Sequence, residues 1–336
     1  MTIKDISLQT GYSVGTVSRV LNHQSNVSEK ARKAILKAAE ASDFQLNTNA
    51  KQLKQQHSNI ILVIVKGTSN LLFGSLEEAL QTRMAETPHT LVVDYMDEDS
   101  NEVRRALQMI VEKKPLGILF LGGNRENFLA DFGKIDIPCV LITDDAAGMP
   151  FGNLSSVSSD DELAGRMAME ALIGLGHRSF AIIGGDRAVS DTARMRYRGC
   201  LKAMEAAGIA FDEELDYETV RFSYEGGYRA ARNLLDRGRK FTALFTMADV
   251  MAIGAVRALV DAGLRVPEDV SVMGFDGLEI GSFTVPQLAT VHQSVESLAD
   301  NSIRILRENI AGKQLPRHET VAVTVQLKES VCPPQI

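Results

Sequence analysis

The segment Gly11–Leu21, GYSVGTVSRVL, constrains the fold of this chain more than any other stretch. The apolar residues of Thr2–Thr10 before it recur at roughly helical spacing, and Gly11 stands where a tight turn is needed. Ser13 is a good N-cap for a second helix, in which three valines and a leucine share one face. The pattern predicts a helix-turn-helix whose second helix enters DNA.

A third short helix is predicted over Glu29–Ala41, with Ser28 as its N-cap. Ile35 and several alanines supply a core stripe, while the lysines of this segment stay in water. Such a three-helix bundle would bury little apolar surface on its own. The segment Asn47–Ser58 that follows is polar, with Leu53 as its only large apolar residue, and its composition alone fits a solvated linker.

The distribution of charge separates this first part of the chain from the rest. The whole chain has a formal net charge of −7 at pH 7. Residues 1–58 hold eight Lys and Arg against four Asp and Glu, which is +4, so the remainder carries −7 minus +4, or −11. A small basic head on a large acidic body suits a DNA-binding module attached to a domain that does not itself bind DNA.

Composition limits the class of protein further. A chain of 336 residues with 45% hydrophobic and 24% charged residues is long enough for more than one ordinary globular domain. Cys139, Cys200 and Cys332 are too few and too scattered for a disulfide framework or a metal knuckle, and buried thiols in a reducing compartment are expected. Neither a signal peptide nor a membrane-spanning apolar run is recognisable, so we expect a cytoplasmic protein.

From residue 60 onward, short β-branched runs alternate with amphipathic helical patterns. Strands are predicted over Ile60–Val65, Thr90–Val93, Gly117–Leu121, Val140–Thr143, Ser179–Ile183, Asp216–Val220, Ala243–Thr246, Ser271–Gly274 and Thr320–Leu327. Helices are predicted over Leu76–Ala85, Asn101–Lys113, Asp161–Leu175, Thr192–Ala207, Gly226–Arg237, Val250–Ala262 and Val295–Ala311. This alternation is typical of an α/β protein with parallel sheets covered on both faces, here in two similar lobes.

A series of motifs in a fixed order resembles the lactose/galactose repressor (LacI/GalR) family of bacterial transcription regulators. The motifs are IKDISLQTGYSVGTVSRVLN (Ile3–Asn22), VSEKARKAILKAAEA (Val27–Ala41), the NxxAxxL element at Asn47, Ala50 and Leu53, IPCVLI (Ile137–Ile142), LGHRSFAIIGG (Leu175–Gly185), RYRG (Arg196–Gly199), VPEDVSVMGFDG (Val266–Gly277) and LATVHQ (Leu288–Gln293). The resemblance covers nearly the whole chain.

The resemblance implies a helix-turn-helix domain at residues 1–46, a hinge helix at 47–58 and a body at 59–336 that is similar to periplasmic sugar-binding proteins. The body is expected to consist of an N-lobe, about 59–158 plus 292–318, and a C-lobe, about 159–291 plus 319–330. In such open α/β sheets a ligand lies between the lobes, at the carboxyl ends of the strands.

The family positions that read base edges correspond to Val14, Gly15 and Arg19. Arg19 can pair with guanine through two hydrogen bonds, and Val14 can touch a thymine methyl group. Gly15 offers no side chain, so few direct contacts to base edges are expected. Without the resemblance, a valine on a helix face such as Val14 is more often a core residue than one that reads bases. The phosphate contacts implied by the resemblance come from Lys4, Ser13, Thr16 and Ser18.

In this family the segment that corresponds to residues 47–56 folds into a hinge helix on the operator. A leucine at the position of Leu53 wedges into the minor groove, which costs base unstacking but bends the DNA. Asn47, Ala50 and Lys51 are the other hinge residues that the resemblance assigns to DNA binding. Lys51 replaces the usual arginine, and the usual glycine and proline before the hinge are here Asp43 and Leu46.

The resemblance places Phe73, Arg196, Phe222, Asp249 and Asp276 in the ligand cleft. These residue types suit a polyol, because aromatic faces stack on sugar C–H surfaces and charged groups hydrogen-bond hydroxyls. Individually each residue has a plainer interpretation, such as a turn cap, a surface ion pair or a core position. One departure from the family is an alanine at 248, where an asparagine is common.

Two other classes of function fit parts of the chain. The body alone would suit a solute-binding protein for transport, but the head and the missing secretion signal argue against it. A sugar- or nucleotide-processing enzyme would need a catalytic constellation, and neither a Ser/His/Asp set, a carboxylate pair nor a metal spacing stands out. His177 and the glycine pairs at 122–123 and 184–185 fit structural turns. We therefore expect no enzyme, no cofactor and no metal.

The favoured interpretation is a ligand-controlled repressor that binds a pseudo-palindromic operator as a homodimer. The final segment Val331–Ile336 lacks the leucine heptads that some relatives use to form tetramers. The expected effector is a sugar or sugar derivative. The alternative is a corepressor-dependent regulator that responds to a purine or to a partner protein, and the sequence leaves the direction of control open.

Overall fold

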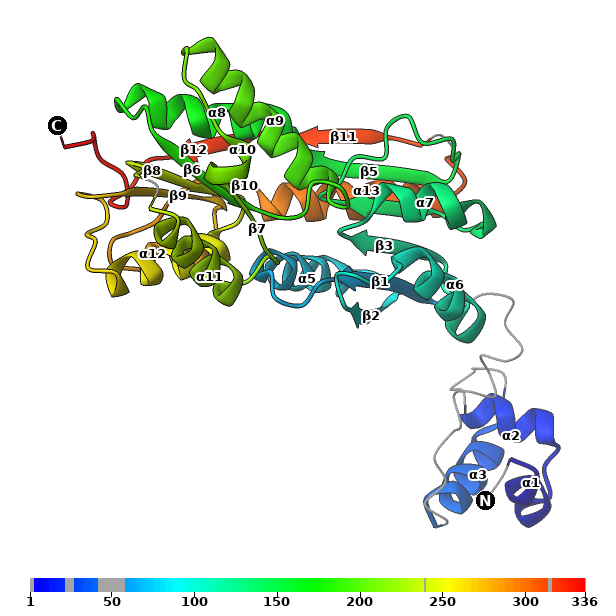
Figure 1. The fold of residues 1–336 in the computed structure, drawn as a ribbon. Coiled ribbons are helices and arrows are strands. Elements are labelled where there is room, and N and C mark those ends of the chain that lie inside the picture. Colours follow the sequence, from blue (N-terminus) through cyan, green and yellow to red (C-terminus); the bar gives the residue numbers. More distant parts are fainter. Residues whose placement is uncertain (1–2, 22–26, 42–57, 239, 314–315, 336) are drawn as a thin grey trace. The chain divides into compact units, whose positions relative to one another are not determined.

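The computed structural model describes residues 3–21, 27–41, 58–238, 240–313 and 316–335 (Figure 1). The chain divides into two compact units, a head over Met1–Ser58 and a body over Asn59–Ile336. The predicted hinge residues Asn47, Ala50, Lys51 and Leu53 lie outside the described residues. No helix within the described ranges is long and apolar enough to cross a bilayer.

The described part of the head contains three helices, α1 (Ile3–Thr10), α2 (Val14–Leu21) and α3 (Glu29–Ala41). Gly11 joins α1 to α2 with a φ of 73°, a left-handed conformation that glycine adopts without strain. The helices pack through a small core, which consists of Ile6, Val17, Val20, Ala31, Ile35, Ala38 and Ala39. This arrangement confirms the predicted helix-turn-helix.

The N-lobe of the body contains a six-stranded sheet with strand order β11-β5-β4-β3-β1-β2, all parallel. Its strands are β1 (Ile60–Lys66), β2 (Thr90–Met96), β3 (Gly117–Leu121), β4 (Cys139–Ile142), β5 (Leu154–Ser159) and β11 (His318–Val321). Strand β1 shows how both faces are covered. Alternate residues of β1 enter two different cores, Val63 on one side and Leu62 and Ile64 on the other.

The C-lobe sheet has the order β12-β10-β9-β8-β6-β7, and only its edge strand β12 pairs antiparallel within the described residues. Its strands are β6 (Phe180–Gly184), β7 (Tyr217–Thr219), β8 (Ala243–Thr246), β9 (Ser271–Asp276), β10 (Ala289–Gln293) and β12 (Val323–Gln326). The two sheets therefore repeat one topology, which confirms the predicted two-lobe α/β body.

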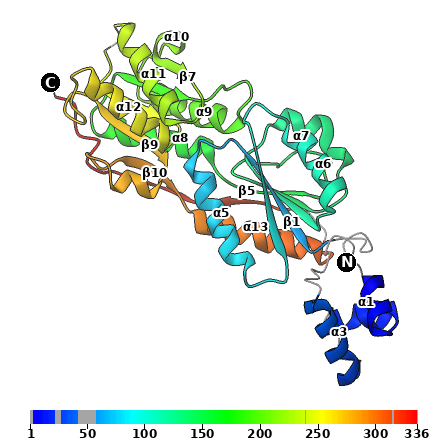
Figure 2. The same ribbon diagram turned by 90° about the horizontal axis from the view of Figure 1, so that it is seen from below.

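Helices cover both faces of each sheet (Figure 2). They are α5 (Leu71–Met84), α6 (Glu102–Lys113), α7 (Arg125–Asp131), α8 (Asp161–Gly174), α9 (Asp191–Ala206), α10 (Glu213–Asp216), α11 (Tyr224–Asp236), α12 (Asp249–Asp261) and α13 (Val295–Ile310). The first three begin after asparagines whose side chains accept a backbone N–H, at Asn70, Asn101 and Asn124.

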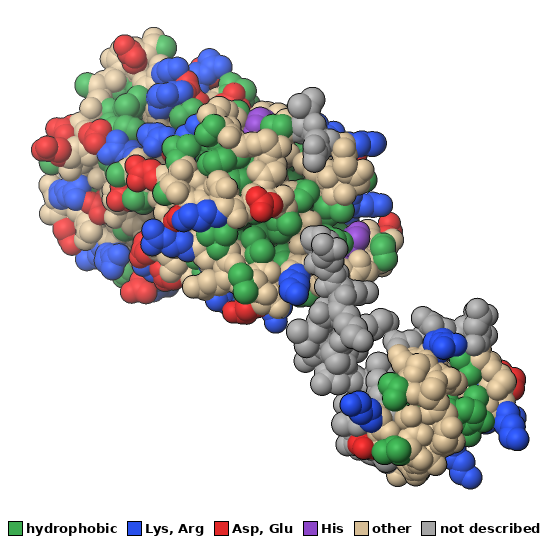
Figure 3. All heavy atoms as spheres, turned by 90° about the vertical axis from the view of Figure 1, so that its right-hand side faces the viewer, with side chains coloured by type: hydrophobic (Ala, Val, Ile, Leu, Met, Phe, Trp, Pro, Cys, Tyr) green, Lys and Arg blue, Asp and Glu red, His purple; other side chains and the backbone are tan. Residues whose placement is uncertain are grey.

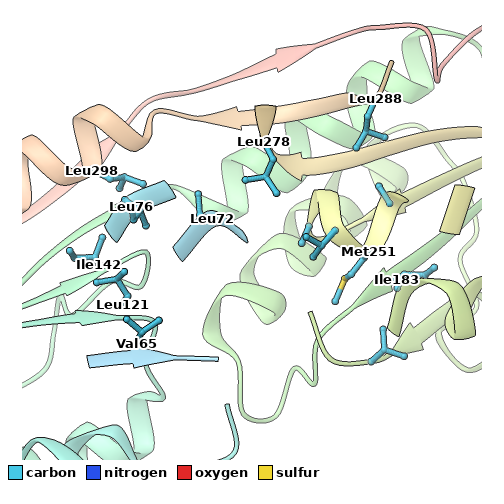
Figure 4. Packing of buried hydrophobic residues seen from close by; sticks show 14 of the residues in the cluster. Val65, Leu72, Leu76, Leu121, Ile142, Ile183, Met251, Leu278, Leu288 and Leu298 are labelled. Atoms are coloured by element: carbon cyan, nitrogen blue, oxygen red, sulfur yellow. The ribbon is translucent and has the colours of Figure 1, made fainter. Parts of the chain in front are cut away.

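One hydrophobic core runs through both lobes. It joins the inner faces of α5 and α13 in the N-lobe to those of α11 and α12 in the C-lobe. Figure 4 shows Leu72 and Leu76 of α5 in the same close-up as Leu278 and Leu288 of the C-lobe. All four side chains are buried, so the lobes share apolar contacts rather than meeting through water.

The predicted single strand Thr320–Leu327 is wrong. Its first half belongs to β11, which pairs with β5 in the N-lobe, and its second half to β12, which pairs with β10 in the C-lobe. The chain therefore changes sheets at Ala322. Strands β5 and β10 and helices α7 and α10 were not predicted as elements. The expected lobe boundaries at 291/292 and 318/319 fall inside β10 and β11.

Candidate functional site

The body contains a cleft of ≈ 510 Å³ at the carboxyl ends of the parallel strands of both lobes. Its N-lobe wall consists of Lys66, Gly67, Asn70, Leu72, Phe73, Glu98, Asp99, Gly122, Gly123, Asn124, Thr143 and Asp144. Its C-lobe wall consists of Gly185, Asp186, Val189, Ser190, Thr192, Arg196, Thr219, Val220, Arg221, Phe222, Arg229 and Asp276. Residues at or just beyond the carboxyl ends of seven different strands thus meet in one cavity, as expected from the sequence for this edge of the sheets.

Arg196 lies on α9 at the base of the C-lobe wall and is only 3% exposed. Its Nε donates to Asp161 Oδ1 at 2.7 Å, and one terminal nitrogen donates to the backbone carbonyl of Met247 at 2.6 Å. Its guanidinium carbon lies 3.5 Å from the centre of the Phe275 ring. Arg196 is therefore a buried, oriented cation, and the interpretation as a surface ion pair does not hold.

Asp276 ends β9 and faces the same cleft. Its φ of 112° is unusual for a residue with a side chain and holds the carboxyl group in a sparsely populated conformation. Oδ1 accepts from Gln293 Nε2 at 2.9 Å, whereas Oδ2 is buried without a hydrogen-bond partner. Burial raises the pKa of Asp276 to about 8. The free oxygen is a polar group that a hydroxyl or amine of a bound ligand would satisfy.

Two phenyl rings line the cleft from opposite lobes, and each rests on a glycine. A Cβ added at Gly122 would lie 3.0 Å from the Phe73 ring, and one at Gly185 would lie 2.6 Å from the Phe222 ring. Both rings are half-buried. The glycines after β3 and β6 therefore make room for the aromatic side chains. This packing explains why glycine stands at two positions where the sequence alone indicated only ordinary strand-end turns.

Asp249 is not brought into the cleft with the other four expected ligand residues. Its side chain is buried at the start of α12, where Oδ1 accepts from the Thr290 hydroxyl at 2.7 Å and Oδ2 accepts from the Leu278 amide at 2.7 Å. Burial raises the pKa of Asp249 to about 7. Asp249 therefore fixes the loop that follows Asp276, so its contribution to the site is through position rather than contact.

Sequence reasoning missed Asp144, which follows β4 in the N-lobe. Its Oδ2 accepts from the Gly123 amide at 3.1 Å, and its Oδ1 accepts from the hydroxyl of Thr192 in the C-lobe at 2.8 Å. Burial raises the pKa of Asp144 to about 7. An acid directly after a predicted buried strand was the available signal, since the same rule identifies Asp276.

The position of Arg196 depends on a close crossing of α8 and α9. A Cβ at Gly165 of α8 would lie 2.2 Å from the backbone oxygen of Arg196, and one at Gly199 of α9 would lie 2.0 Å from the backbone oxygen of Glu162. Two glycines facing each other's helix let the backbones touch. The glycine of the RYRG motif thus has a packing function, which sets the depth of Arg196 in the lobe.

The buried acids predict a pH dependence for the stability of the body. The pKa of a carboxyl group in an unfolded chain is about 3.9, and in the folded protein it is raised to about 7 for Asp144 and Asp249 and about 8 for Asp276. The folded state then holds protons that the unfolded state has lost. The stability that these three groups contribute is therefore fully present below about pH 4 and is lost progressively as pH rises to about 8.

Urea unfolding of the full chain between about pH 5 and pH 8.5 measures this slope. Asp276→Asn keeps the acceptor oxygen for Gln293 and removes the titration. We expect the stability of the variant relative to the parent to increase as pH rises from about 5 to about 8, because at these pH values the parent must take up a proton on folding and the variant need not. Parallel curves for variant and parent would contradict this assignment.

In the head, the exposed side of α2 carries the residues expected to read DNA. Val14 is 45% exposed, and Gly15 and Arg19 are exposed as well, while Val17 and Val20 fill the core. A core position for Val14 is thus excluded. A Cβ at Gly15 would lie 3.7 Å from an Arg19 terminal nitrogen, so the guanidinium folds back toward the start of the helix.

The residues expected to contact phosphates are also accessible. Lys4 and Ser13 are exposed, and Thr16 and Ser18 are half-buried. The Ser13 side chain accepts from the Thr16 amide at 3.2 Å and caps α2. On the face of the body drawn in Figure 3, by contrast, acidic and basic side chains are interspersed.

A helix-turn-helix head whose second helix has an exposed face, and a two-lobe body with a cleft at its strand ends, together define a ligand-responsive DNA-binding regulator. Two family models agree: bacterial regulatory proteins, lacI family, matches residues 2–47, and periplasmic binding protein-like domain matches residues 169–331. The chain is 33% identical over 310 residues to the HTH-type transcriptional repressor PurR of Glaesserella parasuis serovar 5, covering 92% of this chain and 90% of that protein.

Two solved structures have the same architecture. The complex of the transcriptional regulator CelR with cellobiose is 26% identical, covers 98% of this chain and 99% of its own, and has a TM-score of 0.72. The lac repressor dimer bound to operator and the anti-inducer ONPF is 24% identical, covers 99% of both chains and has a TM-score of 0.79, which shows the fold. The chain belongs to the LacI family of transcription regulators.

Proposed function

We propose that this regulator is a repressor whose affinity for its operator is set by a sugar or sugar derivative bound between the lobes. The observation that carries the proposal is the buried Asp276 oxygen without a partner, in a cleft that also presents the Arg196 guanidinium and the Phe73 and Phe222 rings. A hydroxyl-rich ring with apolar C–H faces satisfies all of these groups at once. The cellobiose complex of CelR, a relative by fold and sequence, supports this ligand class.

The cation and acids of the cleft also bear on ligand charge. Arg196 is already occupied by Asp161 and by the backbone of Met247, and burial raises the pKa of the unpaired Asp276 above its usual range. A neutral ligand needs no further counter-charge from Arg196 or Asp276, whereas a phosphorylated sugar could pair with Arg229, which also lines the cleft. Ala248 is fully buried and follows Met247, whose carbonyl Arg196 contacts, so the missing family asparagine leaves a small buried apolar residue there.

For DNA, we propose that the protein binds a pseudo-palindromic operator as a homodimer in the cytoplasm. The reading face of α2 would enter the major groove, with Arg19 as its strong donor. The hinge segment, with Asn47, Ala50, Lys51 and the wedge Leu53, would order on the operator and couple the body to the head.

The effector proposal is tested by a thermal-shift screen of the full chain against neutral sugars, sugar phosphates and purines. Stabilisation that grows with the logarithm of sugar concentration, together with a change in operator affinity at the same concentrations, would support it. Stabilisation by a purine and not by any sugar would reject the sugar proposal and support the corepressor alternative. The operator itself is found by selection from random duplexes.

The base-reading role of Arg19 gives a separate prediction. Arg19→Ala should cost about 1–3 kcal/mol of discrimination at one base pair of each half-site and relax the preference there, because a bidentate contact is lost. Lys4→Ala should weaken binding to all duplexes alike and reduce the salt slope by about 1. Fluorescence anisotropy on the selected operator and on single-base variants measures both. Equal loss on every duplex for Arg19→Ala would reject the reading role.

A further inference from the structure

An acidic loop and one arginine face each other across the rim of the cleft. Asp97, Glu98 and Asp99 follow β2 in the N-lobe, and Arg221 follows β7 in the C-lobe. The Arg221 guanidinium lies 3.2 Å from Asp97, 3.1 Å from Glu98 and in contact with Asp99. One cation therefore meets three consecutive carboxylates that belong to the opposite lobe.

Both partners are held in place by their own lobes. In the acidic loop, the Asp99 amide donates to Asp97 Oδ1 at 3.0 Å, and Lys66 Nζ donates to the Ser100 carbonyl at 2.6 Å. On the other side, the Arg221 carbonyl accepts from the Ser223 amide at 2.8 Å, just before α11. The backbones are therefore ordered independently of the contact, which lowers the entropy lost when it forms.

The charges of Arg221 and the acidic loop favour a closed arrangement of the lobes over an open one. Three adjacent carboxylates repel one another, and burial raises the pKa of Glu98 while Arg221 opposes that shift. If the lobes separate, Arg221 leaves and the three charges remain together on the N-lobe. Opening thus loses three attractive pairs and leaves Lys66 as the cation that still acts on the loop.

From this geometry we infer that Arg221 and the Asp97–Asp99 loop form an ionic clasp that holds the two lobes closed and gates exchange between the cleft and solvent. Glu98, Asp99 and Arg221 all line the cleft, so a ligand passes them when it enters or leaves. Deeper in the cleft the Thr192–Asp144 hydrogen bond joins the same two lobes. The clasp should weaken at high salt, because Asp97, Asp99 and Arg221 are exposed.

Lobe separation can be measured without knowing the effector. Val111 on α6 of the N-lobe and Val260 on α12 of the C-lobe are 77% and 51% exposed, so Val111→Cys and Val260→Cys provide sites for a pair of spin labels. Cys332→Ser removes the half-buried thiol, and Cys139 and Cys200 are buried. The labelled full chain, mixed with excess unlabelled chain, gives the interlobe distance distribution by pulsed electron resonance.

At about 0.1 M NaCl, where the Debye length is about 10 Å, we expect one short-distance population for the parent. Arg221→Ala should add a longer-distance population and lower the closed-to-open ratio by about two- to fivefold. Raising NaCl to about 1 M should move the parent toward that distribution and leave Arg221→Ala unchanged. Arg221→Lys should fall between the two, because it keeps the charge but loses the planar fork.

Arg257→Ala is the matched control, since Arg257 is also an exposed C-lobe arginine but pairs with Asp261 on its own helix. It should behave like the parent. A triple variant with Asp97→Asn, Glu98→Gln and Asp99→Asn should reproduce Arg221→Ala, and combining both changes should add nothing further. The clasp is overturned if the Arg221→Ala distribution matches the parent at both salt concentrations while its melting temperature is unchanged. This outcome would leave the sugar proposal standing, because that proposal is tested by ligand binding.

Discussion

Arg196→Ala is expected to destabilise the body by about 3–5 kcal/mol and to abolish measurable effector binding. Arg196 neutralises Asp161, which is buried with it, and it is the main charge that opposes the raised pKa of Asp276. Without the guanidinium, the buried Asp161 carboxylate loses its counter-charge, the pKa of Asp276 rises further, and the Phe275 ring loses the cation that covers it. Removal of one partner from a buried pair costs far more than the pair itself contributes.

Urea unfolding and thermal-shift titration with the sugar found by screening measure the two effects. Arg198→Ala is the control, because Arg198 lies on the same helix but is exposed and pairs with Glu162, which Lys202 also contacts. It should cost less than about 1 kcal/mol and leave ligand affinity unchanged. Equal destabilisation by both variants would show that Arg196 acts as a surface residue.

Gly165→Val is expected to destabilise the body by a similar amount, about 3 kcal/mol or more. The crossing of α8 and α9 leaves no space for a side chain at this position. Even a Cβ would lie 2.2 Å from the Arg196 carbonyl oxygen, so the helices must move apart. That movement also shifts Arg196, and effector affinity should fall with stability. The glycine is thus needed for function although its own position is outside the cleft.

Gly174→Ala is the matched control, because Gly174 lies on the same helix but away from the crossing with α9. A Cβ at Gly174 meets nothing within 4 Å, and the φ of Gly174 lies outside the left-handed region that favours glycine. The variant should be neutral or stabilising by about 0.4–1 kcal/mol, through the entropy of the unfolded chain. A large loss of stability for Gly174→Ala, or none for Gly165→Val, would contradict the packing argument.

Periodic, apolar segments of this chain were predictable from sequence, and serine-rich ones were not. Strand β5, LSSVSS, has all six residues buried, yet its composition is that of a loop. It is stable as a buried strand because its hydroxyls have partners: Ser155 accepts from Asn309 at 3.1 Å, and Ser159 donates to Gln293 at 2.7 Å. Those partners lie more than a hundred residues away, so no local pattern indicates them.

The ligand site was only partly predictable, because it too depends on tertiary contacts that no local pattern indicates. Phe73, Arg196, Phe222 and Asp276 came from motif resemblance, and the structure brings all four to one cleft. Asp249 carries the same signal, an acid near a strand end, but neighbouring donors turn its carboxylate away from the cavity. The direction of a side chain depends on these tertiary hydrogen bonds, which sequence spacing does not reveal.

The chain passes between the lobes three times, after β5, after β10 and between β11 and β12. Each lobe is therefore assembled from separate stretches of the gene, whereas the head is one continuous stretch. An exchange of a single block of coding sequence between relatives would cut through both walls of the cleft but could carry the whole DNA-reading head. Lineages of such regulators can thus acquire a new operator in one recombination event, while a new effector has to arise by substitution within the cleft.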